Sequence, residues 1–250
     1  MKIRPLLLLS ALLISALPAV QAASPKIDPK ALELLKSMST TLSSAKAFTY
    51  RSESVIEAPS RTGQFITLFS NAKVAVQRPN KISACLTGEA PNFCFLYDGK
   101  TAAAYARGTK TYSQSPAPAT IDAMLPALEN ETGINFVAAP FILSNPYAVL
   151  TSNLQSAIVV GPSKVDGVAC EHLAFRAPGV NWEIWIESGS TPLPRRLAVT
   201  FTDKPNFPRT LVEFSNWNLH PWLCQSCFVF HKPADAHEIP FRSIFKPKGR

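Results

Sequence analysis

The feature that most constrains the fold is the stretch from Val165 to Trp217, which contains four β-type runs separated by Gly, Pro, Asn or Asp. Apolar and polar residues that alternate between such turn residues are typical of consecutive antiparallel strands. No pattern with a helical period interrupts the stretch. It therefore predicts a four-stranded meander that forms one side of the fold.

Further strands are predicted on the N-terminal side of this meander. Period-two patterns occupy residues 48–56, 64–69, 73–77, 81–87, 93–97, 101–106, 110–114 and 157–160. Asp98-Gly99 is typical of a two-residue hairpin turn between two of them. About eleven strands at this spacing are most simply accommodated by one curved antiparallel sheet, so the predicted fold class is mainly β with some helix (α+β).

An amphipathic helix is predicted before the first strand. Asp28 and Pro29 are typical of an N-cap and of the first helical position. Apolar residues then recur at steps of four and three from Ala31 to Ala45, which places them on one face of a helix. The default partner of that face is the core of the protein, and the alternative is that the helix forms a lid over a ligand groove.

A second helical region is predicted between the two groups of strands. Thr120 can cap a helix that reaches about residue 131 and ends at Gly133, and residues 136–143 and 147–153 form two further helical pieces. These short helices carry much apolar surface. We expect them to cover an apolar face of the sheet together with the first helix.

The first 22 residues have the three parts of a secretory signal peptide. Lys2 and Arg4 precede an apolar stretch from Leu6 to Leu17, and small residues follow that allow cleavage after Ala22. About twelve apolar residues are too few for a membrane anchor, because a bilayer span needs roughly 20. We therefore expect the protein to be exported.

Residues 23–250 are expected to form a single domain, because no shift of composition divides them. Its core is expected at residues 28–241, followed by a basic tail at 242–250. The tail could contact the anionic headgroups of a membrane surface, or it could be a solvated chain end. Nucleic acid is not expected as a partner, because no nucleic-acid-binding motif is present in a chain with an export signal.

Three stretches of the sequence together resemble a known family. They are F-L-Y-D-G-K-T-A-A-A-Y (95–105), V-D-G-V-A-C-E-H-L-A-F-R with W-E-I-W-I-E and P-L-P-R-R-L after it, and F-V-F-H-K-P-A-D-A-H-E-I-P-F (228–241). They resemble a family of bacterial predicted periplasmic proteins with no assigned activity. That family is related to the lipoprotein carrier superfamily, which includes LolA, LolB and the lipid-sensing domain of RseB.

The resemblance covers about residues 28–241 and implies a location in the periplasm. It also implies an unclosed β-barrel, which is a strongly curved sheet with a hollow, apolar concave face and helices at its mouth. Characterised relatives hold acyl chains in that hollow. The apolar helical regions described above also require such a surface.

Strand alternation selects the residues that we expect on the concave face. The candidate ligand-binding residues are Trp182, Ile184, Ile186, Leu197, Val199, Phe201, Val212 and Phe214. The alternative is that they form an ordinary core under helices that never move. Trp185 lies between two Glu on the opposite face, where it packs on a neighbouring strand or marks a surface for a partner.

Five cysteines in an exported chain predict disulfides,. Cys85 and Cys94 lie on successive strands, so a cross-strand bond can join them. Cys224 and Cys227 form C-Q-S-C, and Cys170 is then left over, although other pairings stay open.

Two alternatives to a disulfide remain for Cys224 and Cys227. With His220 and His231 they could make a tetrahedral zinc site, or they could be redox-active. The oxidising compartment argues against zinc, and the absence of a thioredoxin-like βαβ pattern argues against redox activity.

Catalytic motifs are not recognisable in the chain, so neither an enzyme activity nor a cofactor is predicted. The preferred hypothesis is a periplasmic binding module that holds a lipid, an acyl chain or another apolar ligand, as carrier or sensor. The alternatives are a redox or metal-binding protein that uses Cys224 and Cys227, and a non-catalytic envelope protein whose helices fill its own cavity. An envelope protein is a further possible partner.

Overall fold

The structure is a computed structural model, which describes residues 27–89, 92–133 and 136–241. The strands are β1 (Ala47–Pro59), β2 (Phe65–Gln77), β3 (Lys81–Gly88), β4 (Phe93–Tyr97), β5 (Thr101–Ala106), β6 (Thr111–Pro116), β7 (Ser156–Val165), β8 (Val168–Ala177), β9 (Val180–Glu187), β10 (Pro194–Phe201), β11 (Arg209–Asn218) and β12 (His237–Glu238). The helices are α1 (Pro29–Ser44), α2 (Ile121–Thr132) and α3 (Pro146–Leu150), with 3₁₀ turns η1 (Arg107–Thr109), η2 (Ala139–Ile142) and η3 (Gln225–Phe228). The predicted signal peptide and basic tail lie outside the described residues.

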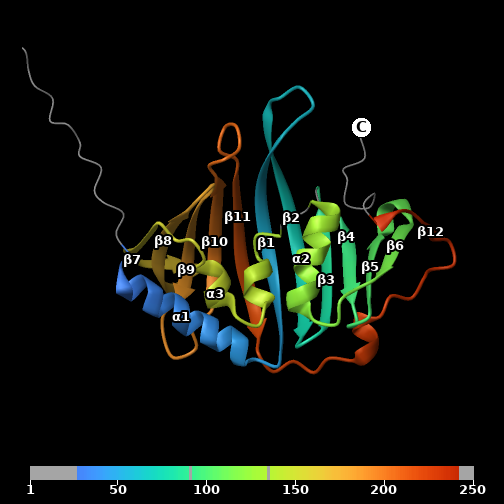
Figure 1. The fold of residues 1–250 in the computed structure, drawn as a ribbon, viewed down its shortest axis with the longest axis horizontal. Helices are drawn as coiled ribbons and strands as arrows, with labels where there is room; N and C mark the ends of the chain where they lie inside the picture. The colour runs from blue at the N-terminus through green and yellow to red at the C-terminus, as the bar shows by residue number, and fades with distance from the viewer. Residues whose placement is uncertain (1–26, 90–91, 134–135, 242–250) are drawn as a thin grey trace, which may run out of the picture.

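These twelve strands form a single sheet in the order β12-β6-β5-β4-β3-β2-β1-β11-β10-β9-β8-β7. Strands β1–β6 and β7–β11 make two consecutive antiparallel meanders, which join where β1 pairs with β11. The outer strands β7 and β12 do not pair with each other, so the curved sheet is an unclosed barrel, as predicted. Figure 1 shows that the helices cover one face of this sheet, with α1 across β7–β10 and α2 across β2–β4.

The predicted first helix is confirmed as α1, and its cap is the one the sequence indicates. The Asp28 carboxylate accepts a hydrogen bond from the backbone N–H of Lys30 at 2.9 Å, and Pro29 is the first helical residue. An N-cap satisfies a backbone donor that the helix itself leaves unpaired. The apolar face of α1 lies against the sheet, and its residues Ala31, Leu35, Met38 and Leu42 are fully buried.

The caps of α2 are also as predicted. The Thr120 hydroxyl accepts from the N–H of Ala123 at 3.3 Å, and Gly133 ends the helix with a φ of 72°. That left-handed conformation is costly for residues with a Cβ atom and free for glycine.

The other two predicted helical pieces are wrong in extent. Only a 3₁₀ turn, η2, forms in the predicted helix 136–143, because Pro140 lacks the N–H that a longer helix needs. The third piece ends at Leu150 rather than at Asn153. Asn153 has a φ of 60°, which an α-helix cannot accommodate.

Two predicted strand boundaries are also wrong. The two strands predicted at residues 64–69 and 73–77 are parts of one strand, β2, which begins at Phe65, since residues 70–72 between them also pair with β1. The predicted short strand at 157–160 continues as β7 to Val165 and turns directly into β8. A two-residue turn joins β7 and β8 at Asp166 and Gly167, which both have positive φ. The hairpin predicted at Asp98-Gly99 is also present, with residues 98–100 between the antiparallel strands β4 and β5.

Alternation along the strands separates two faces. The concave face and the helices enclose the main hydrophobic core, which includes Phe48, Tyr50, Val76, Tyr97, Leu173, Phe175, Ile184 and Phe214. A small second cluster of Val165, Cys170, Trp185 and Ala198 lies on the convex face. Trp182, Ile184 and Ile186 therefore point to the opposite side from Trp185, as the period-two pattern predicts.

Candidate ligand-binding site

The eight apolar residues predicted for the concave face all belong to one cluster under the helices. Trp182, Ile184, Ile186, Leu197, Val199, Val212 and Phe214 are buried, and Phe201 is partly buried at the margin of the same cluster. Trp182 stacks on Phe175 of β8, with ring centroids 4.0 Å apart and an angle of 12° between the planes. The structure thus brings these residues together, and their role in binding a ligand stays a prediction.

Helix α1 covers this cluster with few polar ties to the sheet. One tie is at its start, where the N–H of Asp28 donates to the carbonyl of Ala157 at 2.8 Å. A second is near its end, where Arg78 donates to the Leu42 carbonyl at 3.5 Å. Within the described residues the only ion pair of α1 is internal, between Lys30 and Glu33. Apolar packing therefore provides most of the attachment of α1.

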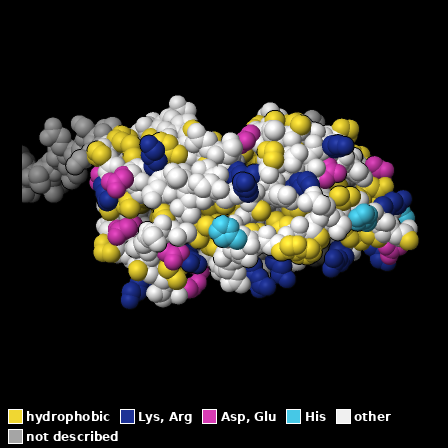
Figure 2. Space-filling model, turned by 90° about the horizontal axis from the view of Figure 1, so that it is seen from below, with side chains coloured by type: hydrophobic (Ala, Val, Ile, Leu, Met, Phe, Trp, Pro, Cys, Tyr) yellow, Lys and Arg dark blue, Asp and Glu magenta, His cyan; other side chains and the backbone are white. Residues whose placement is uncertain are grey.

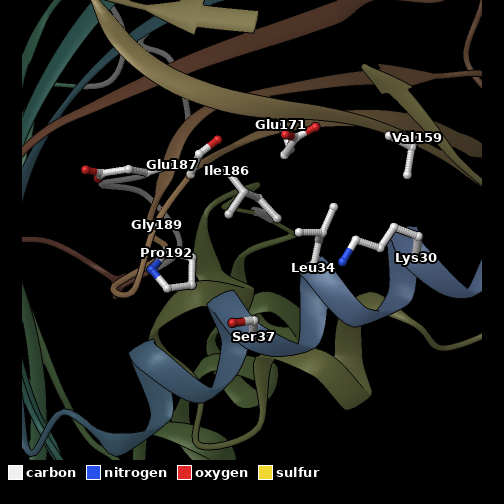
Figure 3. Close-up of a pocket in the computed structure, with 10 residues that line it drawn as sticks. Lys30, Leu34, Ser37, Val159, Glu171, Ile186, Glu187, Gly189 and Pro192 are labelled. Atoms are coloured by element: carbon white, nitrogen blue, oxygen red, sulfur yellow. The ribbon is translucent and has the colours of Figure 1, made fainter. Parts of the chain in front are cut away.

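A cleft of about 340 Å³ opens between α1 and strands β7–β9. It is lined by Lys30, Leu34, Ser37, Val159, Glu171, Ile186, Glu187, Ser188, Gly189 and Pro192. Figure 3 shows Lys30, Leu34 and Ser37 on α1 facing Val159, Glu171 and Ile186 on the strands. The volume is at the lower end of the roughly 300–1,000 Å³ of small-molecule sites.

Part of the wall of the cleft is formed by residues of the apolar core. Ile186 is 1% exposed and belongs both to the lining of the cleft and to the main core. Leu34 and Val159 pack against the same core from α1 and β7. An apolar chain in the cleft would therefore contact Ile186, which is the one residue of the predicted ligand-binding set that lines it.

A smaller cavity lies on the other half of the concave face, under the helical insertion. The second cavity, between α2 and strands β5 and β6, has a volume of only about 40 Å³, enough for about one water molecule. Met124 and Leu128 of α2 are buried there. The space between α2 and the sheet at this point is therefore much smaller than the cleft beside α1.

The charged residues of the cleft differ in how firmly they are paired. Glu187 accepts two hydrogen bonds from Arg195, at 3.0 and 2.6 Å. Lys30 pairs with Glu33 at 2.9 Å, but both side chains are more than half exposed. Glu171 is partly buried and has no hydrogen-bond or ion-pair partner in the part of the chain that the structure describes. Sequence reasoning missed Lys30 and Glu171, because their proximity depends on how α1 docks on the sheet.

Trp185 on the convex face packs on its neighbours, which was one of its two predicted roles. Its ring stacks on His172 at 4.0 Å with an interplanar angle of 10°, and the Arg196 guanidinium lies 5.4 Å from its centroid. His172 also contacts the Glu183 carboxylate at 3.0 Å. With 9% of its surface exposed, Trp185 stabilises the contact of three strands.

Two disulfides are present, Cys85–Cys94 across β3 and β4, and Cys224–Cys227 at the start of η3. Both predicted pairings are confirmed, and Cys170 is free and buried. Burial raises the pKa of the Cys170 thiol. In the described ranges no group of three or more His, Cys, Asp or Glu side chains is arranged to hold a metal ion. Cysteines joined in a disulfide do not supply the thiolates that the zinc alternative requires.

The segment that joins β11 to β12 carries the second disulfide along the lower edge of the sheet (Figure 1). It is tied to the start of β3, because Lys81 donates a hydrogen bond to Gln225. Trp222 on this segment is 88% exposed. Figure 2 views the molecule from below and shows hydrophobic side chains among Lys and Arg along that edge.

Fold and cleft together define a class of protein: an unclosed half-barrel whose apolar concave face is covered by helices. Within that class, the chain belongs to the family described as predicted periplasmic proteins (DUF2092), whose model matches residues 31–242. This confirms the predicted family and, at the level of that description, the periplasmic localisation. None of the helices in the described part of the chain has both the length and the apolar character that a membrane crossing requires.

Several solved structures are similar to the chain. An uncharacterised conserved protein from Thermus thermophilus is 13% identical, with 84% of this chain and 99% of that chain covered and a TM-score of 0.49. The lipoprotein LppX from Mycobacterium tuberculosis is 13% identical, with 76% and 96% covered and a TM-score of 0.49. A LolA superfamily protein from Nitrosomonas europaea is 12% identical, with 80% and 97% covered and a TM-score of 0.40. Similarity at this level says nothing about ligand or activity. No curated protein sequence matches the chain.

Proposed function

We propose that the protein is a periplasmic binding module that takes an acyl chain or another apolar ligand between α1 and the concave face of the sheet. The observation that carries this proposal is the cleft of about 340 Å³, which leads from solvent to the buried side chain of Ile186. The protein then acts as a carrier or a sensor of an amphiphile.

The attachment of α1 supports the proposal energetically. Its four fully buried side chains, Ala31, Leu35, Met38 and Leu42, belong to the main hydrophobic core, and the helix packs on α3 and η2 as well as on strands β7 and β9. An entering acyl chain replaces such contacts with equally apolar ones, so the loss of burial is small. A helix held by many ion pairs would resist this exchange, because each broken pair leaves a desolvated charge.

The direct test is a titration of the delipidated protein with a fluorescent fatty acid, together with lipid extraction of protein purified from the periplasm. We expect saturable binding of about one ligand per chain and a co-purified amphiphile. Leu34→Arg places a charge in the cleft and should weaken binding at least tenfold. Ile66→Arg is the matched control, because Ile66 is 40% exposed on β2, and it should bind like the natural protein.

Protein that stays empty and shows no affinity for acyl chains would contradict the proposal. Equal binding by the Leu34→Arg variant would place the ligand elsewhere. In that case the remaining hypothesis is an envelope protein whose cavity is filled by its own helices.

A further inference from the structure

The polar residues that line the cleft indicate which kind of headgroup a ligand could have. Lys30 lies on the α1 side and Glu171 on the strand side, with Leu34 and Ile186 in the space between them (Figure 3). The cleft therefore presents the Lys30 cation on the α1 wall and two carboxylates, Glu171 and Glu187, on the side of the strands. Neither carboxylate is paired with Lys30, since the Lys30 ammonium binds a carboxylate on α1 itself.

Of the two carboxylates in the lining, Glu171 is the one without a hydrogen-bond or ion-pair partner among residues 27–89, 92–133 and 136–241. It lies on the concave side of β8, two residues from the buried Leu173, and it is directly opposite Ile186 of β9. The other carboxylate of the lining, Glu187, already accepts two hydrogen bonds from Arg195. A ligand group that carries a positive charge would therefore meet Glu171 rather than Glu187.

A purely apolar ligand would leave Glu171 in an unfavourable environment. Methylene groups that enter the cleft remove water from the partly buried carboxylate and give no hydrogen bond in return, which costs free energy. An ammonium group that donates N–H bonds compensates the lost water, and charge-assisted bonds of this kind are about twice as strong as neutral ones.

Lys30 is available to a second group of the ligand. Its ion pair with Glu33 joins side chains that are 57% and 68% exposed, and exposed pairs of this kind contribute only about 0–1 kcal/mol. The ammonium can therefore turn from Glu33 to an anionic group in the cleft at little cost.

We propose that the ligand is an amphiphile whose head combines a protonated amine with an anionic group such as a phosphate. The amine binds the Glu171 carboxylate, the anion binds the Lys30 ammonium, and the acyl chain runs past Leu34 and Ile186 into the core. This inference rests on the proposed function and adds the chemistry of the headgroup to it.

The experiment compares three short-chain phospholipids with identical acyl chains below their micelle concentrations. Phosphatidylethanolamine has an amine with N–H donors, phosphatidylcholine has the same charge without donors, and phosphatidylglycerol has no amine. We expect the natural protein to bind phosphatidylethanolamine about tenfold more tightly than phosphatidylglycerol, as one charge-assisted hydrogen bond provides. Phosphatidylcholine should be intermediate.

Two variants test whether the preference for phosphatidylethanolamine arises in the cleft. Glu171→Gln should abolish most of the discrimination without weakening the binding of phosphatidylglycerol. Glu53→Gln, at an exposed position on β1, is the matched control and should keep it. Lys30→Gln should weaken all three phospholipids and leave a simple alkylamine unaffected, and this exposed position carries no risk to folding.

The results separate this inference from the proposed function. Equal binding of the three lipids, or a preference that survives in Glu171→Gln, overturns the headgroup assignment and leaves the binding module intact. Failure of all three lipids and of the fluorescent fatty acid to bind overturns the proposed function itself.

Discussion

The Arg78 guanidinium donates a hydrogen bond to the backbone carbonyl of Ile142 at 2.7 Å, which ties the turn after β2 to the 3₁₀ turn η2. The same side chain donates to the Leu42 carbonyl near the end of α1 and lies 5.5 Å from the ring of Phe48. Burial lowers the pKa of Arg78, and the nearby Asp122 acts in the opposite direction. The Arg78 side chain therefore connects two of the segments that cover the concave face, α1 and η2.

Replacing Arg78 should weaken the attachment of α1 and η2 to the rest of the fold. We expect Arg78→Met to lower the free energy of unfolding by about 2–3 kcal/mol, because two charge-assisted hydrogen bonds are lost. Arg78→Lys should lose less, since a lysine keeps the charge but not the fork of donors. Urea denaturation measures both, and Arg61→Lys at an exposed turn is the control. If Arg78→Met were as stable as the natural protein, the tie would have no structural role.

The folded protein should also lose stability at alkaline pH because of Tyr50. This side chain is buried against Trp217 and Phe214, and burial raises its pKa above the ordinary value. The fold favours the neutral phenol, so the unfolded chain ionises first, and stability falls as pH rises beyond about 10.

Tyr50→Phe tests this dependence, because it keeps the ring and removes the ionisable group. Unfolding midpoints at pH 8 and above pH 10 should lie closer together in the variant than in the natural protein. Part of the dependence should persist, since the pKa of Tyr97 and of Cys170 is also raised by burial. An unchanged difference would show that Tyr50 does not titrate with unfolding.

The helix caps and the two faces of the strands could be predicted because they depend on residues close together in the sequence. The caps at Asp28, Thr120 and Gly133 depend on neighbouring residues, and the two faces of β9 follow from alternation alone. The chemistry of these features is contained within a few residues, so the sequence is sufficient to place them.

Features that depend on distant parts of the chain could not be predicted in the same way. Strand β12 joins the edge of the sheet beside β6, more than 120 residues away, and its two residues carry no strand pattern. The continuity of β2 depends on pairing with β1. The cleft depends on where α1 lies on the sheet, so Lys30 and Glu171 gave no signal of their common location.

The two disulfides should differ in what they contribute to stability. Cys85 and Cys94 are separated by 9 positions, and Cys224 and Cys227 by 3. Loop-closure entropy then predicts a loss of roughly 3 kcal/mol for the double Ala variant of the first pair and roughly 2 kcal/mol for the second. Denaturation of the oxidised variants measures this, and the reverse order would contradict the entropic account.

The Cys224–Cys227 disulfide also allows a test of the redox alternative. Cys227, which lies in η3, is exposed, so a thiol reagent can reach it. If the bond is structural, thiol titration after equilibration with a glutathione buffer should find only Cys170, and only after unfolding. Two additional thiols in the folded protein would instead support a redox-active pair.

The most direct test of the central claim is photo-crosslinking with an acyl chain that carries a diazirine near its end. If the chain lies between α1 and the sheet, crosslinks should map to the inner face of α1, near Leu34 and Leu35, and to the concave residues Val159, Ile184 and Ile186. An excess of unlabelled fatty acid should compete for them. Crosslinks confined to exposed residues such as Trp222 and Phe69, or crosslinks that resist competition, would contradict the account.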